Sequence, residues 1–153
     1  MPVVIHAAAG AVALLCVSVF WCATAISELS GDHATIAFVK ASILSGMVVL
    51  IPALAVAGAS GLALGRGWKL DLVRRKALRM RFAAANGLLI LVPSAIYLAY
   101  RSGQGVFDAT FYGVQAVELL AGAANFVLLG LNMRDGLALR RRRRSKSALR
   151  APG

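Results

Sequence analysis

The amino-acid sequence predicts an all-α membrane protein, a four-transmembrane-helix bundle, and three observations support this fold class. Of the 153 residues, 59% are hydrophobic, and the mean hydropathy is +0.76. The charged residues gather in a few short segments, whereas a soluble domain spreads them over its surface. Between them lie four apolar segments, each long enough at about 20 residues per crossing to span a bilayer core of about 30 Å.

We expect spans over about residues 3–27, 34–64, 82–100 and 110–133, which together form one domain over residues 1–139. The first span ends near Ala23-Thr24-Ala25, which resembles a signal-peptide cleavage site. No positive residue precedes it and its apolar part is long, so we expect it to be retained as a span.

The second and third spans each contain a proline, Pro52 and Pro93. Proline removes a backbone donor, so each position predicts a kink that either opens a pocket or is simply tolerated. Small residues also recur every four positions in the second span, at Ala53, Ala57 and Gly61. Such a face allows close helix packing, either within the chain or against a second copy in a homodimer or larger membrane complex.

The distribution of the +11 net charge predicts the orientation of the spans. Lysine and arginine concentrate between the second and third spans and after the fourth, and such clusters stay on the cytoplasmic side. We therefore expect both termini in the cytoplasm (N-in/C-in) and a location in a bacterial inner membrane.

Two basic segments are predicted to lie against anionic lipid headgroups. Apolar residues recur at helical spacing over residues 70–81, which predicts a short amphipathic interfacial helix between spans 2 and 3. The tail, residues 140–153, is low in apolar residues and is expected to be disordered. Attraction to headgroups explains these charges better than nucleic acid does, and an acidic protein partner is the alternative for the helix. The lipid-facing basic residues are Arg74, Arg75, Lys76, Arg79, Arg81, Arg140, Arg141, Arg142, Arg143 and Arg144.

One stripe of the fourth span is polar, and it contains the best functional candidate, Glu118. At helical spacing Gln115, Glu118 and Asn125 share one face, with Asn132 further along. A carboxylate at that depth costs several kcal/mol, on the order of 2.5–3.5 by insertion scales, unless it is paired, hydrated or protonated. The stripe therefore predicts a site facing the interior of the bundle.

Counting from the span ends predicts which groups share a depth. Glu118 lies about seven residues, or roughly 10 Å, inward from the outer end of the fourth span. Lys40 lies near the outer end of the second span, and its long side chain can reach down, so we expect the two groups to approach each other, directly or through water. The alternative is that Lys40 extends to the headgroups. Asn86, Asn125 and His6 reach a similar depth on the inner side, as a polar cluster or as interhelical hydrogen bonds that hold the spans together.

We expect no cofactor and no metal site. Cys16 and Cys22 lie on different helix faces without a CxxC partner, and motifs of soluble enzymes are absent. Haem b remains possible through His6. It cannot be held by both histidines of one chain, because His33 lies a whole span away from His6.

Three functions are left open. The first is an accessory or assembly subunit of a membrane complex, with a buried polar cluster around Glu118. The second is a small proton-coupled transporter that uses Glu118. The third is a haem- or quinone-binding electron-transfer protein that uses His6. An enzyme is the less favoured class.

Overall fold

The computed structural model describes residues 2–65 and 71–148, with side chains for residues 3–61, 63 and 78–138. The described backbone is helical throughout, apart from two short connections, and the predicted all-α class is confirmed. The helices are α1 (Pro2–Ser30), α2 (His33–Gly65), α3 (Asp71–Asn86), the π-helical turn η1 (Gly87–Leu91), α4 (Val92–Gly103) and α5 (Ala109–Ala148).

Four helical segments of the described chain are long and apolar enough to cross a membrane, as predicted. They cover Val3–Ser30, His33–Gly61, Leu78–Gly103 and Ala109–Ala138. Each overlaps one predicted span and differs from it by a few residues at its ends. Hydropathy does not define the end of a helix to the residue, because a helix can continue past the apolar part of the sequence. The orientation of the termini remains a prediction.

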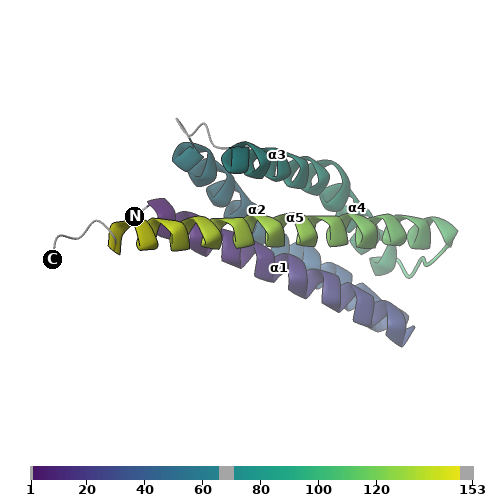
Figure 1. Ribbon diagram of the computed structural model, residues 1–153. Coiled ribbons are helices and arrows are strands. Elements are labelled where there is room, and N and C mark those ends of the chain that lie inside the picture. Colours follow the sequence, from purple (N-terminus) through teal and green to yellow (C-terminus); the bar gives the residue numbers. More distant parts are fainter. Residues whose placement is uncertain (1, 66–70, 149–153) are drawn as a thin grey trace.

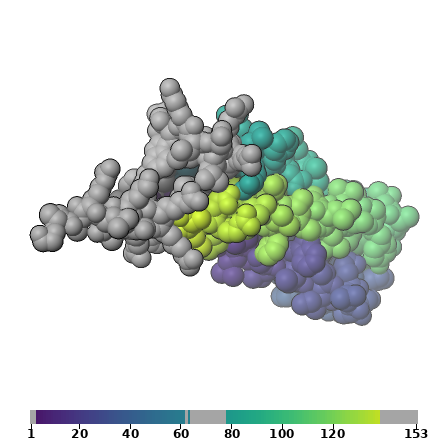
Figure 2. Space-filling view, viewed as in Figure 1, coloured from purple at the N-terminus to yellow at the C-terminus, as the bar shows by residue number. Residues whose placement is uncertain are grey.

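The four spans form a ring in which each packs against two neighbours (Figure 1). Helix α1 packs between α2 and α5, and α2 continues the ring to α4. Figure 2 shows α5 running along the molecule between α1 and α3. In the described residues no Cα atom of α2 comes within 8 Å of one of α5, so these two helices lie across the ring from each other.

A two-residue connection joins α1 to α2 at one end of the bundle, which we call the loop end. Gly31 ends α1 with φ +67°, a left-handed conformation that glycine adopts at no steric cost. Asp32 then caps α2, since its Oδ2 accepts hydrogen bonds from the backbone N–H of Thr35 at 3.0 Å and from the Thr35 hydroxyl at 2.5 Å. These hydrogen bonds hold the pKa of the Asp32 carboxyl below its ordinary value, and the bond from the Thr35 hydroxyl has the largest effect.

The connection from α4 to α5 lies at the same end. Asp108 caps α5 by accepting a hydrogen bond from the Phe111 backbone N–H at 2.9 Å, and it also pairs with Arg101. Beneath this connection Ile36, Leu98 and Phe111 form a buried apolar cluster. The cluster ties α2, α4 and α5 together next to the polar groups described below.

The third span is built from three helical pieces that follow one another without a break, the end of α3, η1 and α4. Pro93 has no N–H for an α-helical bond, and the preceding turn widens, with the Val92 N–H bonded to the Gly87 carbonyl. A kink was predicted at Pro93, and the local change that the structure shows there is this π-turn. The segment predicted to be an interfacial helix, residues 70–81, overlaps the start of α3, and its place at the interface stays a prediction; residue 70 and the side chains of 71–77 lie outside the described residues.

Helix α5 is longer than its span. Its backbone continues as helix to Ala148, where the sequence analysis expects a disordered tail from residue 140. The segment after Gly136 contains leucine, alanine and arginine, which favour helix and extend a helix that is already nucleated. Arg140–Arg144 therefore lie on a helical extension, although their side chains are outside the described part.

Candidate functional site

Lys40 and Glu118 form an ion pair inside the bundle. The Lys40 Nζ lies 2.5 Å from Glu118 Oε2, and the two side chains are 1% and 11% exposed. The predicted approach of these residues is thus confirmed as a direct contact, and Lys40 does not extend to the headgroups. Because α2 and α5 lie across the ring, the pair spans the interior between two helices whose backbones do not touch.

Two further polar groups adjoin the pair. Gln115 donates from Nε2 to Glu118 Oε2 at 3.4 Å, and Lys40 reaches Thr24 Oγ1 at 3.5 Å. Both contacts are long, so the ion pair is the dominant interaction. Both Gln115 and Thr24 are buried, and Gln115 Oε1 has no hydrogen-bond partner among the described residues. The polar groups thus come from α1, α2 and α5.

Glu28 places a second carboxylate close to this pair. It lies within electrostatic range of Lys40, Glu118 and His33, and its Oε1 is buried without a hydrogen-bond partner in the described part of the chain. The sequence analysis assigned no role to Glu28 or Thr24. The signal was present, because both positions and Ser27 share one face of the first span at helical spacing.

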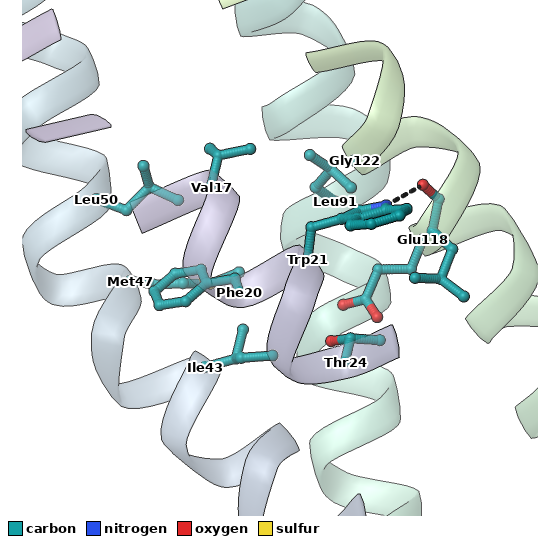
Figure 3. A pocket seen from close by; sticks show the side chains of 11 residues that line it. Val17, Phe20, Trp21, Thr24, Ile43, Met47, Leu50, Leu91, Glu118 and Gly122 are labelled. Carbon is teal, nitrogen blue, oxygen red and sulfur yellow. Dashed lines mark hydrogen bonds between the residues drawn. The ribbon is translucent and has the colours of Figure 1, made fainter. Parts of the chain in front are cut away.

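Glu118 lines a cleft of about 60 Å³ between α1, α2, η1 and α5 (Figure 3). Apart from Glu118 and Thr24, the lining is apolar or aromatic. Figure 3 shows the Glu118 carboxylate pointing toward Thr24, beneath the ring of Trp21. The indole N–H of Trp21 is used, since it donates to the Leu119 carbonyl at 3.0 Å. The other lining residues are Val17, Phe20, Ile43, Met47, Leu50, Leu91, Leu119 and Gly122.

Two glycines make room for the aromatic walls of the cleft. A Cβ at Gly46 would lie 2.5 Å from Phe20 Cζ, and one at Gly122 would lie 3.0 Å from Trp21 Cδ1. Both rings therefore occupy space that any larger residue would fill. The two rings can lie there because Gly46 on α2 and Gly122 on α5 have no side chain, so the cleft depends on both glycines.

Asn86 and Asn125 meet in the other half of the bundle, as predicted. Asn86 donates from Nδ2 to Asn125 Oδ1 at 2.9 Å and to the Ala121 carbonyl at 2.8 Å. Asn125 donates in turn to the Ala83 carbonyl at 3.2 Å. The two asparagines thus join α3 to α5 by three hydrogen bonds.

His6 is not part of that pair of asparagines. Its Nδ1 lies 3.0 Å from the Ala57 carbonyl and 3.2 Å from Ser60 Oγ, and its ring packs over Gly61. The predicted inner cluster is therefore correct for the asparagines only. Ala57 and Gly61 of the second span thus lie against His6 of α1, so small residues here allow close packing within the chain.

Arg79 corrects one of the lipid-facing assignments. Its Nη1 donates to Asp135 Oδ2 at 2.7 Å, so Arg79 binds α5 instead of facing headgroups alone. The sequence analysis assigned Arg79 to the headgroups because hydropathy and spacing do not reveal that α3 lies beside α5. Arg81 is exposed, whereas the side chains of Arg74, Arg75, Lys76 and Arg140–Arg144 lie outside the described residues.

Asn132, further along α5, is 4% exposed, and neither its Oδ1 nor its Nδ2 has a partner among the described residues. Across all the described residues, no group of three or more His, Cys, Asp and Glu residues is placed to hold a metal ion.

Comparison with known proteins gives no matching family model, no matching curated protein and no matching solved structure.

Proposed function

We propose that this protein is an accessory or assembly subunit of a membrane complex, located in a bacterial inner membrane with both termini in the cytoplasm. Four apolar helices are compatible with a small membrane protein. The observation that carries the proposal is that ion pairs and hydrogen bonds between side chains join α5 to other helices of the same chain at three successive depths.

Three of the interhelical side-chain contacts involve α5. Lys40–Glu118 lies toward the loop end, Asn86–Asn125 lies deeper, and Arg79–Asp135 lies furthest from that end. The first joins α5 to α2, the second joins it to the end of α3, and the third joins it to the middle of α3. In a low-dielectric interior such contacts fix helix positions, because breaking one leaves a polar group without a partner. This pattern suits a rigid subunit.

A proton-coupled carrier is the second candidate, and the cleft beside Glu118 favours it. A carrier, however, needs its carboxylate to exchange partners during each cycle, and Glu118 is already bonded to Lys40 and almost fully buried. An electron-transfer role through His6 has less support, because Nδ1 of His6 is engaged by α2.

Reconstitution separates the first two candidates. The purified chain is placed in liposomes with an imposed pH gradient, and an internal pH dye follows its decay. A subunit leaves the decay at the rate of empty liposomes. A faster decay that returns to that rate in Glu118→Gln would contradict the proposal and establish a carrier.

Blue-native electrophoresis of the source membranes tests the subunit role directly. The wild-type chain is expected to migrate in a complex larger than itself, together with one or more other membrane proteins in fixed proportion. Glu118→Leu is expected to release the chain from the complex, and Lys40→Met/Glu118→Leu is expected to restore it. Migration of the wild type as a free monomer would contradict the role.

A further inference from the structure

We propose that the cleft beside Glu118 binds the primary ammonium group of an amphiphile dissolved in the membrane. The acceptor is Glu118 Oε1. Both bonds to this carboxylate, from Lys40 and from Gln115, are made to Oε2, and no described group bonds Oε1. The carboxylate lines the cleft, so the occupant must donate a hydrogen bond to it.

The charges around the cleft favour a cationic donor. With both carboxylates ionised and His33 neutral, Glu28 and Glu118 carry two negative charges, and Lys40 supplies one positive charge within range of both; His33 also lies within range of Glu28. Lys40 is bonded to Glu118, so the half-buried Glu28 has no cation bonded to it among the described residues. A bound ammonium would give two carboxylates and two cations. A fatty acid would add a third negative charge and is excluded on the same ground.

The size and lining of the cleft define the rest of the ligand. A volume of about 60 Å³ holds a few groups of water size, at about 10–15 Å³ each, which suits the aminomethyl end of a chain and excludes a ring. Phe20 and Trp21 form the walls, and an ammonium is attracted to aromatic faces. Trp21 is 39% exposed, so the cleft reaches the surface of the bundle, where the remaining alkyl chain would meet lipid.

Binding is measured by fluorescence in nanodiscs made of phosphatidylcholine. The chain has two tryptophans, Trp21 and Trp68, so Trp68→Phe leaves the cleft residue as the only tryptophan, which is excited selectively over the three tyrosines at long wavelength. Dodecylamine is expected to change the Trp21 emission saturably, and dodecanol is expected to bind about tenfold more weakly or less, because a hydrogen bond from a charged donor is the stronger one. Dodecyltrimethylammonium, whose head has no N–H and is too large for the cleft, should bind as weakly as dodecanol.

Variants assign the effect to the cleft. Glu118→Gln should weaken dodecylamine binding about tenfold or more by the same reasoning. Because that variant also disturbs the ion pair, Glu28→Gln provides a second test, since it removes a charge and leaves Lys40–Glu118 intact. Asp108→Asn is the matched control: it removes a carboxylate from the cap of α5, outside the cleft, and should bind as the wild type does.

The source of the ammonium is found by changing the lipid. Weaker dodecylamine binding in nanodiscs that contain phosphatidylethanolamine would identify the lipid headgroup as the competing ligand, and unchanged binding would identify a free amine. The proposal is overturned if dodecanol binds as tightly as dodecylamine. It is also overturned if Glu118→Gln and Glu28→Gln both bind dodecylamine with wild-type affinity.

Discussion

Replacing Glu118 with leucine leaves the Lys40 ammonium, 1% exposed, without its partner in the interior of the bundle. Removing one member of a buried ion pair costs about 3–5 kcal/mol, because the remaining charge loses its bonded partner. Glu28 stays within electrostatic range of Lys40 and keeps part of the compensation. Lys40 lies about seven residues, or roughly 10 Å, from the start of α2, so part of the cost is recovered if its side chain swings toward the headgroups. We therefore expect a loss of about 3 kcal/mol, at the lower end of that range.

The double variant Lys40→Met/Glu118→Leu provides the decisive comparison. With both charges gone and similar volumes retained, a buried pair can be replaced at no cost or with a gain of about 1–4 kcal/mol. The free energy of unfolding is measured by titrating sodium dodecyl sulfate into mixed micelles and following the helical circular dichroism. The reasoning is refuted if Glu118→Leu is within about 1 kcal/mol of the wild type, or if the double variant is less stable than Glu118→Leu.

Three further predictions use the same unfolding measurement. Asn86→Leu removes the hydrogen bonds to Asn125 and the Ala121 carbonyl and should cost about 0.6–2 kcal/mol; an unchanged stability would show that these bonds do not hold α3 to α5. Gly46→Ala places a Cβ against Phe20 and should cost about 1–3 kcal/mol, most of it recovered in Gly46→Ala/Phe20→Leu. The pKa of Asp32 is lowered in the folded state, so its cap stabilises α2 above the ordinary value of 3.8, and this contribution is lost as the pH falls through the lowered pKa. Asp32→Asn should abolish that part of the acid dependence, and an identical pH profile for the variant would contradict the assignment.

The number of spans and the ion pair could be predicted because each depends on distance along the chain. Hydropathy locates a span, and counting residues from its end gives depth at about 1.5 Å per residue. Lys40 and Glu118 share a depth, and each has a strong reason to face the interior. Asn86 and Asn125 were found in the same way.

The groups around the pair could not be predicted, because they depend on how each helix is rotated and on which helices are neighbours. Glu28 sits near the end of its span, where hydropathy alone assigns it to the aqueous connection. His6 has a depth similar to that of Asn86, yet its helix packs on α2, so it contacts Ser60 instead. Arg79 and Asp135 meet only because α3 lies beside α5.

Solid-state NMR of the protein in lipid bilayers tests the ion pair most directly. The chain has only two glutamates, Glu28 and Glu118, and four lysines, so labelling lysine with ¹⁵N and glutamate with ¹³C gives few possible pairs. We predict a strong dipolar coupling between a lysine Nζ and a glutamate side-chain carboxyl carbon, retained in Glu28→Gln and lost in Lys40→Met. Absence of this coupling, together with magnetisation transfer from bulk water to the Lys40 ammonium, would contradict a pair buried between α2 and α5.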